Sequence, residues 1–362
     1  LIVPVIFFSV TSGIAAIGDV QRLKRIGSKV VIVYFLMTVI ACIVGIVMVN
    51  ITHPGVGFTL DNMQAFDTSK VKTPSFVNFL FDMVPVNIVD SMAKNQIMQM
   101  IFFTVLVGVA LVSLGEKVAG VTKIFDQCAS IIYKMLDIVM LYSPIGVLAL
   151  MANTTAVFGP KLFGVLAKFV FTDWVGCLLI WFFFSGIVWL YTKVNYLEMC
   201  KSMIPIWVNT IATNSSAGTI PITLNVTTER LKVPMSIASF SIPLGATINL
   251  TGAALYKTIL AFFVAEIYGL QLTIDQILMV IIISTIMSIA APGIPGGGIV
   301  TGAIFLNLLG LPMDLMGPIA GMYRLIDMSH TTVNVSGDVL GTMLVAKNEN
   351  IWTGEDFNKT LV

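Results

Sequence analysis

Charged side chains are scarce in this chain of 362 residues. Aspartate, glutamate, lysine and arginine make up 11% of it, whereas ordinary soluble domains contain about 25%. The net charge is only +1 and no basic patch occurs, so we expect no nucleic-acid partner. Hydrophobic residues make up 57%, which predicts an all-α polytopic membrane protein.

Cysteine and histidine are also rare. The four cysteines are isolated, with no CxxC spacing and no histidine neighbour, so we expect them to be buried small hydrophobic residues. They carry no information about the redox compartment. Of the two histidines, His53 lies among turn-forming residues and is interpreted as a solvated loop residue, whereas His330 belongs to a polar segment near the C-terminus.

Long hydrophobic runs are plentiful, and among others we expect spans over residues 27–51, 98–114 and 237–269. The chain has room for roughly eight spans or re-entrant segments of about 20 residues each. It begins at Leu1 inside an apolar run that ends near Ile17, and we expect a first span to be missing before it. Arg22, Lys24 and Arg25 follow this run, which favours the cytoplasmic side for that loop.

Further features are expected along the chain. A span over residues 131–152 is expected to kink at the Ser-Pro-Ile-Gly sequence that begins at Ser143. A span over residues 162–191 is interrupted by Asp173 and Trp174, which we expect near its midpoint or against a partner. From residue 348 onward the chain is polar and is expected to be a frayed tail.

The segment 324–338 combines charged and polar side chains. At helical spacing, four of them fall at i, i+4, i+7 and i+11 and share one face: Asp327, Thr331, Asn334 and Asp338. Charges inside a membrane segment are costly, so they usually face a bundle interior or a cavity and mark a pathway. The alternative is a pair of structural carboxylates tied to Arg324 and His330. Because hydroxyl and amide groups share the same stripe, we favour a binding site.

Two other segments have the pattern of hairpins that enter and leave the same side of a membrane. In residues 203–226 a polar stretch from Thr213 to Thr219 divides two apolar arms, and in residues 277–309 a run of proline and glycine does the same. Such backbone is tolerated at membrane depth only when it is buried in protein or lines a cavity. The alternative for the serine-rich tip is a simple polar loop.

An internal similarity follows the two hairpins. Residues 245–252 read G-A-T-I-N-L-T-G and residues 330–337 read H-T-T-V-N-V-S-G. Interrupted segments at corresponding positions of two halves are the sequence sign of a transporter site built from inverted repeats. We therefore expect a broken helix after each hairpin.

The chemistry that such a site needs is available. Asn249, Asn334 and Asp338 offer hard oxygen ligands that suit Na⁺, and Thr247 and Ser288 could add to them. Ser215 and Ser216 at the first tip could bind a carboxylate through N–H and O–H donors. Asp327 could pair with a substrate ammonium group, so an amino acid zwitterion is the expected guest.

The residues resemble those of a known family, the dicarboxylate/amino acid:cation symporters with the glutamate transporter fold, over nearly the whole chain. The resemblance rests on residues 213–221, 241–252, 293–298 and 327–338, and it is highly specific. It implies two re-entrant hairpins, inverted repeats, a homotrimer in a lipid membrane, and an elevator motion of a transport domain against a scaffold. The implied divisions are scaffold in 1–22, transport domain in 23–51, scaffold and trimerisation domain in 52–155, transport domain in 156–347 and a polar tail in 348–362.

The resemblance also implies residue roles. The implied substrate-binding residues are Ser215, Ser216, Ala253, Ile294, Pro295, Gly298, Asp327, His330, Thr331 and Asn334. Two sodium sites are implied. One holds the ion through Gly245, Asn249, Asn334 and Asp338, and the second holds it through Thr247, Ser288, Ile289 and Ala291. The implied location is the plasma (inner) membrane.

The chain departs from the family pattern at several positions. His330 replaces the arginine, and Ala253 the threonine, that hold the side-chain carboxylate in acidic amino acid transporters. Loss of the bidentate arginine removes much of the reason to prefer glutamate or aspartate. Thr251 replaces the aspartate of the third sodium site, and Met37 and Thr38 stand where that site has Thr-Ser. We therefore expect fewer coupled sodium ions.

Two basic residues have no obvious counterpart in the family. Lys257 stands where relatives have glutamine or glutamate, and it could be a proton carrier, a tethered substitute for a cation, or a side chain that reaches an interface. Arg324 could pair with Asp327 or anchor a substrate.

These observations predict a sodium-coupled symporter of a small neutral amino acid such as serine, threonine or alanine. The alternative is a symporter of acidic amino acids or C4-dicarboxylates, possibly coupled to protons. A dicarboxylate lacks the ammonium group that would explain Asp327. An intramembrane hydrolase would need a Ser–His or paired-Asp arrangement, and no nucleophile setting accompanies His330, so we expect no enzyme.

Overall fold

The structure is a computed structural model. It describes residues 2–5, 7–8, 11–15, 26–57, 81, 84–94, 96–142, 145, 148–149, 152, 156, 161–289, 293 and 296–358. The secondary structure of these residues is helical, and none of them forms a strand.

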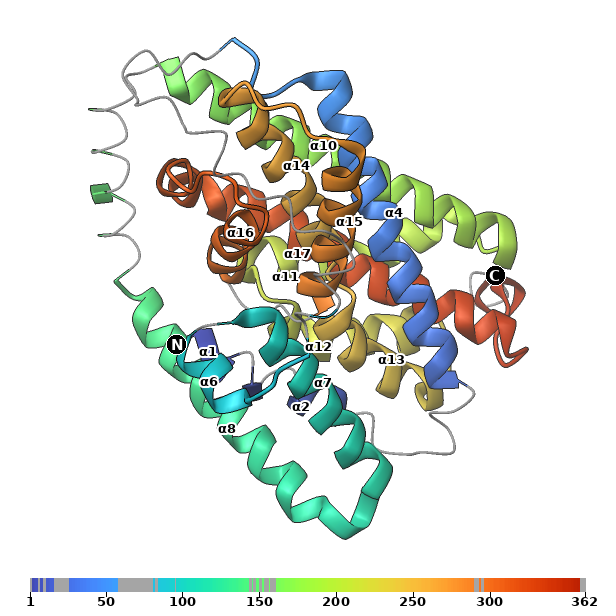
Figure 1. Ribbon diagram of the computed structural model, residues 1–362. Coiled ribbons are helices and arrows are strands. Elements are labelled where there is room, and N and C mark those ends of the chain that lie inside the picture. The colour runs from blue at the N-terminus through green and yellow to red at the C-terminus, as the bar shows by residue number, and fades with distance from the viewer. Residues whose placement is uncertain are drawn as a thin grey trace.

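The first group of helices comes from residues 2–140 of the chain. Figure 1 shows these helices together on one side of the molecule. Its members contact one another through α2 with α7 and α8, and through α1 with α8. Stacked and tilted rings of Phe7, Phe103 and Phe125 fill the space between them. The bounds are α1 Ile2–Val5, α2 Thr11–Ala15, α6 Ile88–Ala93, α7 Ile97–Leu114, the 3₁₀ turn η4 Gly115–Val118 and α8 Ala119–Met140.

The second and larger group surrounds a nearly fully buried helix, α14 (Thr251–Ile267). The helix α4 (Ser28–Thr52) lies along α14, and α10 (Lys161–Thr192) lies along α17 (Met316–Asn348). Large apolar side chains such as Ile32 on α4 and Phe182 on α10 are exposed on the outside. This apolar exterior is the one expected where a helix faces lipid.

Two pairs of helices and one broken helix complete this group. The first pair is α11 (Tyr196–Thr213) and α12 (Ser216–Asn225), and the second is α15 (Ile274–Ile289) and α16 (Gly297–Leu308). The first pair continues into a π-helical turn, η5 (Val226–Arg230), and α13 (Met235–Ile248) precedes α14. Asn249 and Leu250 separate α13 from α14.

The turn within the first pair has a clear local cause. Asn214 adopts a left-handed conformation (φ 51°), which asparagine tolerates better than most residues. The Ser215 side chain then accepts a hydrogen bond from the Gly218 N–H at 3.0 Å and caps α12. The polar stretch that predicted a tip therefore ends one helix and begins the next.

Four of the described helical segments are long and apolar enough to cross a membrane, judged by length and composition. They are Ser28–Thr52, Phe102–Ile132, Leu162–Thr192 and Met235–Ile267. The first, third and fourth match predicted spans, and α7 lies where a span was predicted over residues 98–114.

Other expectations need correction. The helix α8 begins at Ala119, well before the span predicted over residues 131–152, and the kink predicted at Ser143-Pro144 lies mostly outside the described residues. The helix α10 runs through Asp173 without a break. As expected, Asp173 lies near the midpoint of this helix and against a partner, because its buried carboxylate accepts from Ser329 and lies 2.8 Å from His330 Nε2 on α17.

The prediction of a broken helix after each hairpin is correct only once. The helices α13 and α14 are separated at Asn249, but α17 is continuous through residues 330–337. The frayed tail is also wrong for residues 352–358. Trp352 is buried and donates from Nε1 to the Leu231 carbonyl at 3.1 Å, and α18 (Gly354–Asn358) follows it. His53 is mostly exposed, but its Nδ1 lies 2.9 Å from Glu266 Oε1.

Candidate functional site

The turns of the two helix pairs touch each other. Ser215 Oγ donates to the Gly293 carbonyl at 3.2 Å, and the Ala217 N–H donates to the same carbonyl at 3.3 Å. A side chain at position 293 would lie 2.6 Å from the Ala246 carbonyl, so only glycine permits this approach. Both turns therefore meet at the C-terminal part of α13, next to the break before α14.

The polar stripe of α17 joins both turns. Asp327 Oδ2 accepts from the Gly296 N–H at 3.0 Å. On the other side, Asn214 Nδ2 donates to the Arg324 carbonyl at 3.1 Å, and Arg324 Nη2 donates to the Ala212 carbonyl at 3.4 Å. Arg324 thus contacts the first turn, and no ion pair with Asp327 occurs among the described contacts.

All four predicted stripe residues are buried: Asp327, Thr331, Asn334 and Asp338. Asn334 Oδ1 accepts from the Gly252 N–H at 2.7 Å and lies 3.5 Å from Thr251 Oγ1. This contact satisfies one of the free N–H groups in the first turn of α14. Helical spacing predicted the shared face correctly, and the start of α14 is one of the elements that it faces.

Asp338 combines with Asn249 in a set of oxygen ligands. Asp338 Oδ1 accepts from Asn249 Nδ2 at 2.9 Å, and Asn249 Oδ1 is buried without a partner among the described residues. Gly245 lies directly against the Asp338 carboxylate, where any side chain would collide with it. No lysine, arginine or histidine pairs with Asp338 in the described part of the chain. A buried carboxylate beside an orphaned amide oxygen fits a hard cation such as Na⁺.

The second implied sodium site looks different. Ser288 is fully buried, and its Oγ lies 3.3 Å from Lys257 Nζ. Thr247 Oγ1 donates to the Leu244 carbonyl at 2.7 Å, and no hydrogen bond joins it to Ser288 among the described contacts. Ala291 and the side chain of Ile289 lie outside the described residues, as do Ile294 and Pro295 of the substrate set.

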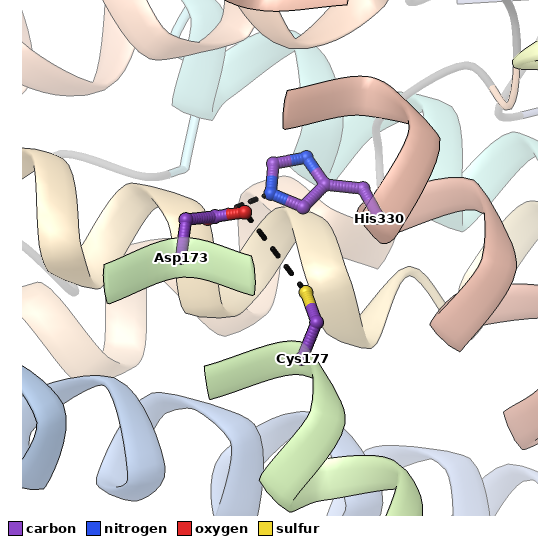
Figure 2. A group of neighbouring side chains, drawn as sticks. All are labelled: Asp173, Cys177 and His330. Atoms are coloured by element: carbon purple, nitrogen blue, oxygen red, sulfur yellow. Dashed lines mark hydrogen bonds and ion pairs between the residues drawn. The ribbon is translucent and has the colours of Figure 1, made fainter. Parts of the chain in front are cut away.

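His330 lies against Asp173, a partner that the sequence did not identify. His330 Nε2 lies 2.8 Å from Asp173 Oδ1, and both side chains are almost completely buried. Ser329 Oγ donates to Asp173 Oδ2 at 3.1 Å, and Cys177 Sγ lies 4.0 Å from the same oxygen. Figure 2 shows Asp173 and Cys177 projecting from one helix, α10, toward His330 on α17. His330 therefore has a protein partner in addition to the place in the substrate set that the resemblance implies.

The three side chains in Figure 2 form a hydrogen-bonded group whose spacing differs from that of a metal centre. Their possible ligand atoms lie within 4.8 Å of one another. However, a zinc ion about 2 Å from each of two ligands would hold those ligands roughly 3.3 Å apart. The 2.8 Å separation of His330 Nε2 and Asp173 Oδ1 is that of a direct hydrogen bond.

Two tyrosines also surround His330 and were missed by the sequence reasoning. The His330 ring lies 5.3 Å from that of Tyr256 and 6.2 Å from that of Tyr323. Gly298, a predicted substrate residue, lies directly against the Tyr323 hydroxyl. His330 Nδ1 is buried without a described hydrogen-bond partner, so one ring nitrogen remains for another group. The rarity of acidic side chains in apolar helices is a signal for Asp173, whereas no comparable signal pointed to the two tyrosines.

Comparison with known proteins identifies the family. The model of the sodium:dicarboxylate symporter family matches residues 1–348. The chain belongs to this family. A proton/glutamate-aspartate symporter of Bacillus subtilis is 30% identical over 362 residues, covering 99% of this chain and 87% of the relative. The corresponding symporter of Escherichia coli is 32% identical over 360 residues, covering 97% and 82%.

A third relative widens the range of named substrates. A C4-dicarboxylate transport protein of Bacillus subtilis is 30% identical over 359 residues, covering 97% of this chain and 84% of the relative. These relatives are named for acidic amino acids and dicarboxylates, none of them for neutral amino acids. They support the acidic alternative better than the neutral substrate that the sequence predicted. Membership in a family of symporters also supports transport over the hydrolase alternative.

Proposed function

We propose that this chain is a cation-coupled symporter that binds an acidic amino acid between the turns of its two helix pairs and the polar stripe of α17. The observation that carries the proposal is the meeting of both turns with each other and with Asp327. In a membrane, exposed turns of this kind need a polar guest or a protein partner. A solute bound there would be enclosed by the two turns and α17, and it would be released when the two turns move apart.

The acidic substrate is supported by the named relatives and by charge. Asp327 suits a substrate ammonium group, which an amino acid has and a C4-dicarboxylate lacks. For the second carboxylate, the chain offers His330 at the position of the missing arginine. Asp173 lies 2.8 Å from one ring nitrogen, and the unpartnered Nδ1 would donate to the substrate when it carries a proton. Glutamate and aspartate are therefore proposed ahead of C4-dicarboxylates.

A neutral amino acid is the second candidate, and one observation favours it. The hydrogen bond of His330 to Asp173 uses one ring nitrogen, and Ala253 offers no hydroxyl where the family has threonine. A neutral imidazole could serve a substrate hydroxyl as well as a carboxylate. The zwitterion contacts at Asp327 and Asn334 would then carry most of the binding.

The coupling cation is proposed to bind at Asp338 and Asn249. The unpartnered amide oxygen and unpaired carboxylate support Na⁺ there. Relatives from Bacillus caldotenax and Geobacillus stearothermophilus are named proton/sodium-glutamate symport proteins, and others are named for protons alone. Sodium is therefore proposed as the coupling ion. The alternative is a proton, and the experiments below compare the two.

The architecture implied by the resemblance is part of the proposal. The helices α1, α2, α6, α7 and α8 would belong to the scaffold, and the larger group would be the transport domain. Within the described residues, the two groups of helices touch chiefly where α2 packs against α13. The packing of α4 against α14 supports its place in the transport domain. A homotrimer in the plasma membrane, re-entrant hairpins and an elevator motion remain proposals.

A thermal titration tests substrate and cation together. The purified chain is heated with glutamate, aspartate, succinate, serine or alanine, each with sodium and with choline in its place. A ligand that binds the folded state raises the unfolding temperature. We expect aspartate or glutamate to raise it only with sodium. Stabilisation by serine alone would transfer the proposal to neutral amino acids, and stabilisation by none of the solutes would overturn it.

A further inference from the structure

The ammonium group of Lys257 is buried between two helices without a carboxylate. The side chain has no solvent exposure, and its Nζ donates to the Ala253 carbonyl at 3.2 Å and to Ser288 Oγ at 3.3 Å. No aspartate or glutamate forms an ion pair with it in the described part of the chain. A buried charge needs compensation, so neutral oxygen atoms must supply it here.

Oxygen atoms on α14 and α15 supply that compensation. Ala253 lies one turn before Lys257 on α14, and Ser288 lies on α15, near the end of its described part. Hydroxyl groups continue along the same helix. Ser284 is buried without a described partner, and Thr285 lies beside it.

An ammonium group and a sodium ion need the same kind of ligands at such a site. Both are monovalent cations, and both are satisfied by hydroxyl and carbonyl oxygen atoms. Ser288 is also a residue that the family resemblance assigns to the second sodium site. In this chain it contacts Lys257 Nζ, so the oxygen atom is already engaged by a cation that belongs to the protein.

We propose that the ammonium group of Lys257 takes the place of a sodium ion between α14 and α15, beside Ser288. It is a tethered cation that is carried with the helices and never released. The second cation site therefore takes up no sodium, and the number of sodium ions bound with substrate is one lower. This inference rests on the proposed cation-coupled transport and defines its ion requirement.

The position of the side chain excludes the alternative of a lysine that reaches an interface. Such a lysine keeps its charged end in water, whereas Lys257 has no exposed surface. The proposal also differs from a substrate anchor. The Nζ atom contacts the backbone of Ala253 and the side chain of Ser288, and no described contact joins it to Asp327 or Asn334.

The test compares the sodium dependence of substrate binding in wild-type protein and Lys257→Gln. The slope of log(1/Kd) for substrate against log sodium concentration gives the number of sodium ions bound with it. Glutamine removes the charge and offers a carbonyl ligand, so the slope should increase by one. Lys257→Arg keeps the charge and should keep the wild-type slope. Lys201→Gln, which removes an exposed lysine paired with Glu198, is the matched control and should also leave it unchanged.

Equal slopes in wild-type and Lys257→Gln proteins that both bind substrate would overturn the proposal. A second variant covers the case in which Lys257→Gln does not fold. In Ser288→Ala the slope should remain that of the wild type, because Ser288 holds an ammonium group and no sodium. A slope lower by one in Ser288→Ala would show that sodium uses this hydroxyl and would contradict the proposal.

A measurement without substrate separates this inference from the proposed function. Sodium alone, titrated against choline, should raise the unfolding temperature of Lys257→Gln more steeply than that of the wild type. If none of the solutes binds, the proposed substrate class is wrong, but this difference still reports on Lys257. The absence of any difference would count against the tethered cation, whatever the substrate.

Discussion

At the scale of single residues, Asp338 is the position where burial and charge conflict most clearly. Its carboxylate is almost fully buried, with Asn249 Nδ2 donating a hydrogen bond to it at 2.9 Å and no described cation beside it. Burying such a carboxylate lowers the stability of the folded protein unless a cation binds beside it. The conflict is resolved if sodium completes the site.

The variant Asp338→Asn tests this interpretation. It should lower the slope of substrate affinity against sodium by one, while the unfolding temperature without sodium stays equal or rises, because no buried charge remains uncompensated. Both quantities are measured by titration and thermal unfolding. Asp90→Asn removes an exposed aspartate that pairs with Lys94 and should change neither. An unchanged slope in Asp338→Asn would remove Asp338 from the ion site.

Substrate choice should depend on His330 and Ala253. Replacing His330 by arginine and Ala253 by threonine restores both contacts to a side-chain carboxylate that the family uses. The double variant should bind aspartate at least about tenfold more tightly, or about 1.4 kcal/mol, and lose affinity for serine. Competition binding measures both. If aspartate binding does not improve while the protein still binds another amino acid, our account of selectivity is wrong.

Sequence reasoning at this scale succeeded where spacing along one helix was enough. Asp327, Asn334 and Asp338 share a buried face as the periodicity of α17 predicted. It could not pair Asp173 with His330, because the two residues are separated by 157 positions. Without that pairing, Asp173 was expected only near the midpoint of its span or against an unidentified partner, and His330 was assigned to the substrate set.

At the scale of elements, the contact between the two turns is central. Ser215 holds this contact in two ways: it caps α12 through Gly218 and bonds the Gly293 carbonyl of the second pair. Asn195 caps α11 in the same manner, by accepting from the Glu198 N–H, but at the opposite end of that helix. Ser215 and Asn195 are therefore two comparable N-caps, of which only Ser215 also contacts the second turn.

Replacing each capping residue by alanine distinguishes the effect of losing a helix cap on stability from the effect of losing the contact between the two turns on substrate binding. Ser215→Ala and Asn195→Ala should each lower stability by about 1 kcal/mol, because each leaves a helix N–H without its cap. Only Ser215→Ala should also weaken substrate binding and speed its release. Thermal unfolding and dissociation kinetics measure the two effects. Equal substrate dissociation rates in both variants would show that the contact between the two turns does not retain the substrate.

The turn between α11 and α12 was predictable because the polar residues 213–219 interrupt an apolar run, and proline and glycine interrupt the run between α15 and α16. The prediction of a second broken helix was wrong, because the motif at residues 330–337 resembles residues 245–252 in sequence but not in backbone. Asn249 lies between two helices, whereas Asn334 lies within a continuous one. Burial on all sides, by α10, α11, α13 and α14, keeps α17 helical through its polar residues.

At the scale of the whole molecule, composition alone predicted a helical membrane protein, and family membership agrees with it. The docking of the C-terminal segment could not be predicted from its polarity. Trp352 and Phe357 are buried there, and Asn358 donates to the Lys193 carbonyl at 3.0 Å. Two apolar side chains in a polar stretch were sufficient to attach it to the larger group of helices.

Uptake into sealed vesicles tests the central claim most directly. The purified chain is reconstituted in liposomes, and labelled aspartate is supplied outside under an inward sodium gradient, an inward proton gradient, or no gradient. Our account predicts concentrative uptake driven by sodium, abolished by a sodium ionophore and absent in Asp338→Asn. Uptake of aspartate that equilibrates without concentrating under every gradient would contradict coupled symport by this chain.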